Sequence, residues 1–575
     1  MTGKTSLLPP DYIEIPAAAA DDLEKSLKNP APGKIAAALW RRDSSVWKGS
    51  QELIKNRLGW LDLPENTARK LPEIERFSRR VREAGATRVT LAAMGGSALM
   101  SKVFGGAFLS EKSPRLEVLD TTVADTIAGS LEKTDFEKTF FIASSKSGKT
   151  VETASVANFF FDECSKAIGE QRAAERFAAI TDPGTPLFES ARERGFGAIF
   201  EGDETVGGRF SPLSVFGMVP SAAIGADIGA ILSSARDMSA RVKGTETGGA
   251  NCNTALRLAV AVDLFCKRGN GKFYVRCSDG IAGFDRFVEQ IVGESLGKDG
   301  AAVLPVAHPL PESGREKFGG AFFVCLKNDE ETFARAKKTA DSGVPVVITV
   351  VDGKQGLGGE IFRWETAVAI AGAMWGVNPF DQPDVENAKA QARRFMEIHS
   401  REGSLPFPAP DFTDGGAEFS ATEKLTDADG FRPYFEKNAA KKREDGYFCV
   451  QAFLDGADEK NRLAMEKFRA ALSQTFGVTV TADIGPAYLH SSGQIHKGDG
   501  GKGFFIQIGG ACAKDVAIPA SPHSGASFEI LKNAQMLGDR EALENAGRKV
   551  VQITSPAGAA DAIAKASKLL GIDAS

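Results

Sequence analysis

Histidine, cysteine and an excess of charge of one sign are all scarce in this chain. Five histidines and seven cysteines occur among 575 residues, and they form no HxH, HExxH or CxxC pattern. Zinc ribbons, zinc hydrolases and redox dithiols need such close pairs, so the sequence predicts no metal site. The dispersed, odd set of cysteines fits reduced thiols buried in a cytosolic core, at positions 164, 252, 266, 277, 325, 449 and 512.

The net charge of -5, from 70 basic and 75 acidic residues, argues against a large non-specific nucleic-acid surface. Long apolar runs are also missing. The longest, at 344–351 and 366–377, fall short of the roughly 18 residues that a membrane span needs. The first 25 residues lack the basic flank and apolar run of a secretion signal. The sequence therefore predicts a cytoplasmic protein with no nucleic-acid or membrane partner.

Apolar strand patterns alternate with helical patterns over most of the chain. Strands are expected at 88–94, 116–121, 138–143 and 177–181, each followed by a segment of helical length. Such alternation is typical of a mostly parallel sheet with helices on both faces. A second series of the same plan has its strands at 272–276, 320–326 and 344–351. The fold class predicted is α/β, with two doubly wound, mostly parallel domains and a smaller C-terminal α+β module.

A chain of this length is too long for a single core. The segment 403–432 is rich in proline and glycine and has few periodic positions, which is typical of a linker. The expected divisions are a helical segment at 1–80, α/β domains at 81–230 and 231–402, a linker or surface excursion at 403–445, and the α+β module at 446–575.

The most informative local pattern is SSKSGKT at 144–150, which lies between an apolar strand and a helix. A helix start presents unpaired N–H groups and a partial positive charge to the preceding turn. Gly148 allows close approach of the backbone, and the hydroxyl and lysine side chains add donors and charge. Together these features predict a phosphate site.

Two other interpretations of this loop stay open. Ala143 together with Gly148-Lys149-Thr150 satisfies a relaxed P-loop pattern, which would bind a nucleotide with Mg²⁺. A nucleotide cradle prefers glycines, however, whereas this loop has one glycine among four hydroxyl residues, which suits a single sugar phosphate better. The loop could also be a purely structural helix cap.

Five motifs in order resemble the phosphoglucose isomerase family and its sugar-isomerase (SIS) domains. They are GGS at 95–97, SSKSGKTVET at 144–153, GGRFS at 207–211, ESLGK at 294–298 and NPFDQPDVENAK at 378–389. The segment 488–498, YLHSSGQIHKG, is further similar to the isomerase part of bifunctional transaldolase/phosphoglucose isomerases. No segment of transaldolase length precedes it, so a transaldolase activity is not predicted.

The resemblance implies interconversion of glucose 6-phosphate and fructose 6-phosphate, in glycolysis and gluconeogenesis, without a cofactor. Such a reaction needs a base that moves a proton between C1 and C2, and the match is Glu294. Charge that develops on O1 and O2 needs a cation, and the match is Arg209. Lys389 is implied as one member of the acid–base pair that opens the sugar ring. The resemblance also implies a homodimer.

The second member of that pair should be a histidine, and here the sequence departs from the family pattern. Most members carry Gly-Gln-His between the Glu and Lys motifs, whereas the only histidine in that interval is His308, without Gly-Gln before it. Gly493-Gln494 lies instead in the C-terminal module, two residues before His496. We therefore expect His496 to be catalytic, in preference to His490.

The remaining site residues are expected to bind the substrate. They come from the glycine turn after the first strand, the phosphate loop, the segment before Arg209, the helix of Glu294 and the C-terminal module: Gly96, Ser97, Ser145, Lys146, Ser147, Thr150, Thr153, Gly208, Gln290 and His490. A non-catalytic sugar-phosphate sensor is the main alternative function, and a P-loop nucleotide hydrolase is a weaker one.

Overall fold

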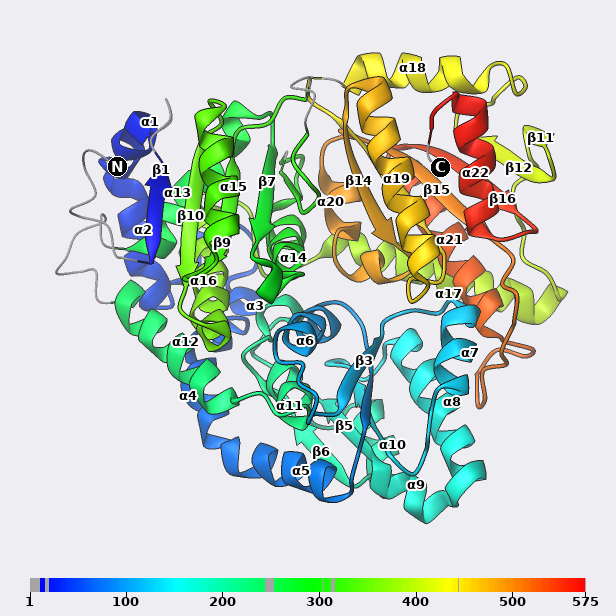
Figure 1. Cartoon of the computed structure of the whole chain (residues 1–575), viewed down its shortest axis with the longest axis horizontal. Coiled ribbons are helices and arrows are strands. Elements are labelled where there is room, and N and C mark those ends of the chain that lie inside the picture. Colours follow the sequence, from blue (N-terminus) through cyan, green and yellow to red (C-terminus); the bar gives the residue numbers. More distant parts are fainter. Residues whose placement is uncertain are drawn as a thin grey trace.

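The computed structural model describes residues 11–15, 20–243, 253–301, 303–311, 316–442 and 444–573. Three sheets organise the chain, and Figure 1 shows each of them covered by helices. In the described part of the chain, no helix is both long enough and apolar enough to cross a membrane. The α/β fold class expected from the sequence is confirmed, including two mostly parallel domains and a C-terminal module with a mixed sheet. Cys252 lies outside the described residues, and the other cysteines are buried except for Cys512, which is partly exposed.

The first domain is built on a fully parallel sheet with the order β3-β2-β4-β5-β6. Its apolar runs form the strands β2 (Arg88–Ala93), β3 (Arg115–Leu119), β4 (Thr139–Ser144), β5 (Phe177–Thr181) and β6 (Ala198–Glu201). The associated helices are α6 (Gly96–Ala107), α7 (Ala124–Glu132), α8 (Val151–Ile168), α9 (Glu170–Arg176), α10 (Pro186–Glu193), the short η3 (Gly208–Phe210) and α11 (Val215–Ala223).

The second domain has the sheet order β1-β10-β9-β7-β8, parallel except for the pairing of β1 with β10. Its strands are β1 (Tyr12–Ile15), β7 (Lys272–Cys277), β8 (Leu304–Val306), β9 (Ala321–Leu326) and β10 (Val346–Val351). Its helices are α12 (Ile228–Lys243), α13 (Thr254–Arg268), α14 (Phe284–Leu296), α15 (Glu330–Asp341) and α16 (Leu357–Trp375).

The N-terminal segment packs onto both α/β domains. It contains α1 (Ala20–Leu27), α2 (Pro30–Trp40), α3 (Gln51–Lys55), α4 (Leu63–Arg69) and α5 (Leu71–Glu83). Expected as purely helical, it also supplies β1, whose four residues gain backbone hydrogen bonds from the edge of β10. Trp47 and Trp60 are buried, so these helices share the core of the two α/β domains.

The C-terminal module has a six-stranded sheet in the order β11-β12-β16-β15-β13-β14. Its strands are β11 (Phe412–Asp414), β12 (Ala417–Ala421), β13 (Tyr447–Ala452), β14 (Thr479–Ile484), β15 (Gly503–Gly510) and β16 (Lys549–Ser555). Its helices are α18 (Phe431–Lys442), α19 (Glu459–Phe476), the short η8 (Ala487–His490), α20 (Gly493–Gly498), α21 (Phe528–Asn545) and α22 (Ala559–Leu570).

The expected linker at 403–445 belongs to this module instead. β12 pairs with β16, and Phe431 and Phe435 of α18 are fully buried in the core of the module. The many prolines and glycines concealed these short elements, since neither three-residue nor five-residue strands produce a clear periodic pattern. A long helix, α17 (Pro383–Glu402), precedes them and packs along α21 (Figure 1).

Candidate active site

A cavity of about 560 Å³ lies where the first domain, the second domain and the C-terminal module meet. Loops that follow β2 and β4 form one wall, as expected for ligand sites beyond the carboxyl ends of parallel strands. The segment that leads into η3, the end of α14, the beginning of α17 and the end of η8 also line it. Most of the predicted site residues line this cavity, although they come from separate stretches of the chain: Gly96, Ser97, Ser145, Lys146, Ser147, Thr150, Gly208, Arg209, Glu294, Lys389 and His490.

The phosphate loop connects β4 to the first turn of α8. Thr150 occupies the N-cap position of α8 but makes no capping hydrogen bond to the helix, so backbone N–H groups of its first turn face the loop. The Ser145 hydroxyl donates to the Thr150 hydroxyl over 2.9 Å, which orients both toward the cavity they line. Gly148 adopts a positive φ of 62°, which closes the turn. This arrangement offers hydroxyl and amide donors to one phosphate group.

Lys146 contributes less charge to this loop than the sequence suggested. Its ammonium donates to both carboxylate oxygens of Asp182, over 2.8 and 2.6 Å, and to the carbonyl of Asp203. Asp182 begins the turn after β5, 36 residues away in the sequence. The ion pair positions Lys146 beside the loop, but neutralises most of its field. Because the two residues are so far apart in the sequence, their spacing does not predict that they pair.

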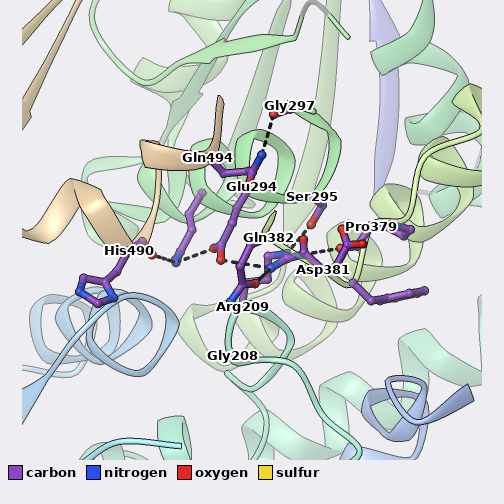
Figure 2. A network of polar contacts seen from close by, with 12 residues as sticks. Gly208, Arg209, Glu294, Ser295, Gly297, Pro379, Asp381, Gln382, His490 and Gln494 are labelled. Carbon is purple, nitrogen blue, oxygen red and sulfur yellow. Dashed lines mark hydrogen bonds and ion pairs between the residues drawn. The ribbon is translucent and has the colours of Figure 1, made fainter. Parts of the chain in front are cut away.

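Glu294 and Arg209 form the centre of the polar network in Figure 2. Glu294 lies in the last turn of α14, and Arg209 lies in η3, with only 2% of its surface exposed. Arg209 Nη1 donates to Glu294 Oε1 over 3.1 Å. The other guanidinium donors bind the Ser295 hydroxyl, the Gln382 side chain, and the carbonyls of Pro379 and Asp381.

Every N–H group of the Arg209 guanidinium therefore donates a hydrogen bond to an acceptor of the protein. A guanidinium held in this way cannot rotate toward a ligand, and it acts as a fixed positive charge beside the carboxylate. The partners from 379–382 lie in the NPFDQ motif, which explains why that motif accompanies GGRFS and ESLGK in one site. Lys298, four residues after Glu294, donates to the carbonyls of Asn378 and Asp381 and ties down the same segment.

Gln290 lies one turn before Glu294 on α14 and does not line the cavity. Its side-chain amide donates to Glu294 Oε2 over 3.3 Å and to the backbone carbonyl of His490 over 3.0 Å. Gln290 thus connects the carboxylate to the C-terminal module. Thr153, another predicted residue outside the cavity, is buried in α8, and its hydroxyl has no hydrogen-bond partner among the described residues.

His490 is the histidine at the cavity. Its Nε2 lies 2.9 Å from Oε1 of Glu152, a fully buried carboxylate in the first turn of α8. Burial alone would raise the pKa of Glu152, but the interaction with His490 outweighs it and holds the pKa below its ordinary value. Gln535 of α21 also donates to Glu152 Oε1. An ionised Glu152 therefore orients the imidazole. Glu152 belongs to the SSKSGKTVET motif, but nothing in that motif predicts its partner.

The preference for His496 does not agree with this geometry. His496 is 1% exposed and does not line the cavity. Its ring packs between Tyr488 and Phe505, and burial lowers its pKa well below the ordinary value. His308 is also buried, and it accepts a hydrogen bond from the backbone N–H of Ala482. Of these three histidines, only His490 can reach a ligand in the cavity.

Two glycines allow the C-terminal module to approach the first domain closely. Gly95 has a positive φ of 59°, and a Cβ there would lie 2.8 Å from the carbonyl oxygen of His490. At Gly96, a Cβ would lie 2.4 Å from the carbonyl oxygen of Gly208. Larger side chains at these positions would separate His490 and Arg209 from the phosphate loop. The pair GG at 95–96 is therefore a packing requirement as well as a turn.

Gln494 also links the C-terminal module to the elements that form the cavity. Its side-chain oxygen accepts from the backbone N–H of Asp384, at the start of α17, and its amide lies 3.4 Å from the carbonyl of Gly297, at the end of α14 (Figure 2). The Gly-Gln pair that precedes His496 thus has a positioning role. Lys389, in the second turn of α17, lines the cavity and pairs with Glu386 over 2.9 Å.

Known proteins resemble this chain over the residues that build the cavity. A family model described as phosphoglucose isomerase matches residues 75–299. A glucose-6-phosphate isomerase of Thermus thermophilus is 30% identical over 387 residues, which are 59% of this chain and 89% of that protein. The chain belongs to the phosphoglucose isomerase family. A glucose-6-phosphate isomerase of Streptococcus pyogenes is 26% identical over 385 residues, with 58% of this chain and 85% of that protein covered.

Solved structures share the fold. A hypothetical protein of Thermus thermophilus has a TM-score of 0.56 and 25% identity, and the match covers 66% of this chain and 99% of that one. The fold also resembles a glucose-6-phosphate isomerase of Chlamydia trachomatis, with a TM-score of 0.50, 20% identity, and 64% and 78% of the two chains covered. In each comparison about a third or more of this chain lies outside the match.

Proposed function

We propose that this protein interconverts glucose 6-phosphate and fructose 6-phosphate by proton transfer through a cis-enediolate. The observation that carries the proposal is the convergence of Glu294, His490 and Lys389 on one cavity that also contains a phosphate loop. A binding protein would need the loop but would have no use for a carboxylate, an imidazole and an ammonium around the rest of the sugar. Family membership supports the same reaction class.

The phosphate group is assigned to the loop of Ser145, Ser147 and Thr150. Hydroxyl and backbone N–H donors at the start of α8 suit a dianion, and the helix adds a favourable partial charge. Nucleotide hydrolysis is not supported by this geometry. Lys149, the lysine of the apparent P-loop pattern, is exposed and does not line the cavity.

Glu294 is assigned as the base that carries the proton between C1 and C2. The hydrogen bonds from Gln290 and Arg209 hold its carboxylate at the cavity wall, with one oxygen bound by each. As the enediolate forms, negative charge builds on the sugar oxygens. Arg209 stabilises that charge through its fixed field, because its N–H donors are already engaged by the protein.

Ring opening is assigned to His490 and Lys389. Glu152 accepts the proton of His490 Nε2, which leaves Nδ1 as the nitrogen that exchanges a proton with the sugar. Lys389 lies on α17 at the same cavity and supplies the second exchangeable proton. His490 comes from the C-terminal module of the same chain, so the cavity needs no residue from another subunit for this step. The homodimer implied by the family stays a prediction.

The direct test is conversion of glucose 6-phosphate to fructose 6-phosphate, followed by a coupled assay without added nucleotide or divalent metal. We expect turnover by the wild-type protein, and release of no phosphate from ATP or GTP with Mg²⁺. Retained binding of the sugar phosphate without turnover would contradict the proposal and would favour a sensor.

Ser145→Ala should weaken substrate binding more than it slows chemistry. The variant removes a hydroxyl donor of the phosphate loop, and a hydrogen bond to a charged group contributes about 1.5–3 kcal/mol. We expect KM to rise by about 10–100-fold with kcat changed much less. Ser110→Ala, a change outside the cavity to an exposed hydroxyl that bonds Ser113, is the control. A large loss of kcat with unchanged KM would contradict the assignment.

A further inference from the structure

A second group of reactive side chains lies in the C-terminal module, outside the candidate active site. Cys449 of β13, Asp483 of β14 and His496 of α20 place one ligand atom each within 4.8 Å of the other two. His496 Nε2 lies 3.5 Å from Cys449 Sγ and 3.5 Å from Asp483 Oδ2, and the latter two atoms are 3.7 Å apart. The side chains of Cys449 and Asp483 point to the same side because their strands pair in parallel, with a two-residue offset.

These spacings fit a bound divalent cation. A point equidistant from three atoms so arranged lies about 2.1 Å from each of them, close to the distances of about 2.0–2.3 Å that zinc makes to nitrogen, oxygen and sulfur. Thiolate, imidazole and carboxylate are all common zinc ligands. The donor set therefore agrees with zinc in both chemistry and dimensions.

A catalytic Cys-His-Asp relay is a poorer description of the group. Such a relay needs the cysteine and the carboxylate on opposite ring nitrogens, whereas here both approach Nε2 of His496. A bound metal would explain why three ligand atoms converge on one point.

The surroundings of His496 provide the outer support that metal-bound histidines usually have. Gln451 approaches the other ring nitrogen, with its side-chain amide 3.2 Å from Nδ1. The Oε1 atom of the same amide is buried and finds no partner among the described residues. Reversing the amide would let Oε1 accept the Nδ1 proton, which would leave Nε2 free to bind a cation.

The local charge also favours a cation. Arg286 of α14 is shared by two partly buried carboxylates, with Nη1 2.7 Å from Glu289 and 3.8 Å from Asp483. The other cations near His496 are already paired with carboxylates, as Lys497–Asp539 and Arg548–Asp499. A dication bound by one thiolate and Asp483 would balance this excess of negative charge.

A separate cavity of about 200 Å³ borders the group and is lined by Asp483 and Ser492, whereas Cys449 and His496 are buried and do not line it. The Ser492 hydroxyl lies 2.8 Å from Asp483 Oδ2. A fourth ligand, either this hydroxyl or a water molecule, therefore has room to complete a tetrahedron.

We propose that Cys449, Asp483 and His496 form a structural binding site for one zinc-class divalent cation. The cation joins β13, β14 and α20, and so closes the segment from 484 to 495 at its base. That segment carries His490, and any effect of the metal on turnover rests on the function proposed above. No short motif marks this site, because its ligands are 34 and 13 residues apart in the sequence.

Metal content and cobalt spectroscopy test the site independently of turnover. We expect the chain, purified without chelator, to hold about one equivalent of zinc by elemental mass spectrometry. After removal of the zinc with a chelator, Co²⁺ should bind and produce a thiolate-to-cobalt charge-transfer band. Zinc added back should raise the unfolding temperature of the metal-free chain. Absence of both zinc uptake and cobalt binding would overturn the proposal.

Variants locate the metal. Cys449→Ser and Asp483→Asn should each lower cobalt affinity by more than about 100-fold, beyond the usual effect of losing an outer partner. Cys325→Ser is the matched control, since Cys325 is an equally buried thiol in β9. If Cys449→Ser does not fold, Asp483→Asn, which changes a cavity-lining side chain, decides the question. Equal cobalt affinity and spectra in Asp483→Asn and wild type would overturn the site.

Discussion

Glu294→Gln is expected to lower kcat for the interconversion of glucose 6-phosphate and fructose 6-phosphate by about 10²–10⁴-fold, the range for loss of a general base. Glutamine occupies the same volume but cannot accept a proton. KM should change little, because the phosphate loop is intact. Exchange of the sugar C2 proton with deuterated solvent should fall in parallel, which assigns the loss to proton transfer.

The control for this variant is Glu204→Gln. Glu204 lines the same cavity, but in the described part of the chain its side chain makes no hydrogen bond to Arg209, whose donors are bound elsewhere. Thermal unfolding of both variants should show that they fold, since Arg209 retains four other hydrogen-bond acceptors in Glu294→Gln. Full activity of a folded Glu294→Gln variant would refute the mechanism.

His490→Asn should lower kcat on the cyclic substrate by about 10²–10⁴-fold as well, because an acid–base group is lost from ring opening. The asparagine amide preserves a donor in the direction of Glu152, so the fold should be retained. Glu152→Gln should have a smaller effect in the same direction, since it leaves the imidazole in place but removes the charge that orients it. Steady-state kinetics on the purified variants provides the measurement.

His523→Asn, a change outside the cavity, is the control for His490→Asn. The comparison with His496→Asn separates the two histidines of the segment 488–498. We expect His496→Asn to act through stability and metal binding, and its unfolding temperature should fall. If His490→Asn kept normal turnover while a folded His496→Asn lost it, the order of preference inferred from the sequence would be right.

Local sequence patterns were enough to predict much of the fold. Apolar runs such as FFIAS before the phosphate loop identified the parallel strands, because a strand buried on both faces needs no alternation. The loop SSKSGKT, the turn GGS and the helix of Glu294 were also recognisable. In each of them the functional groups lie within a few residues of one another in the sequence. Residues 403–445 were misjudged because their short strands are stabilised by β16, more than 100 residues later.

The sequence by itself determined the fold class, and its motifs and family resemblance predicted the phosphate loop and the base Glu294. The tertiary structure decided which histidine faces the cavity, why Lys146 is bound to Asp182, and how Cys449, Asp483 and His496 come together. His490 and His496 lie six residues apart in similar surroundings of sequence, yet one ends against Glu152 and the other in the core of the module. The physical reason is that contacts between distant segments decide where these side chains point and with which groups they pair. The local sequence does not specify those contacts.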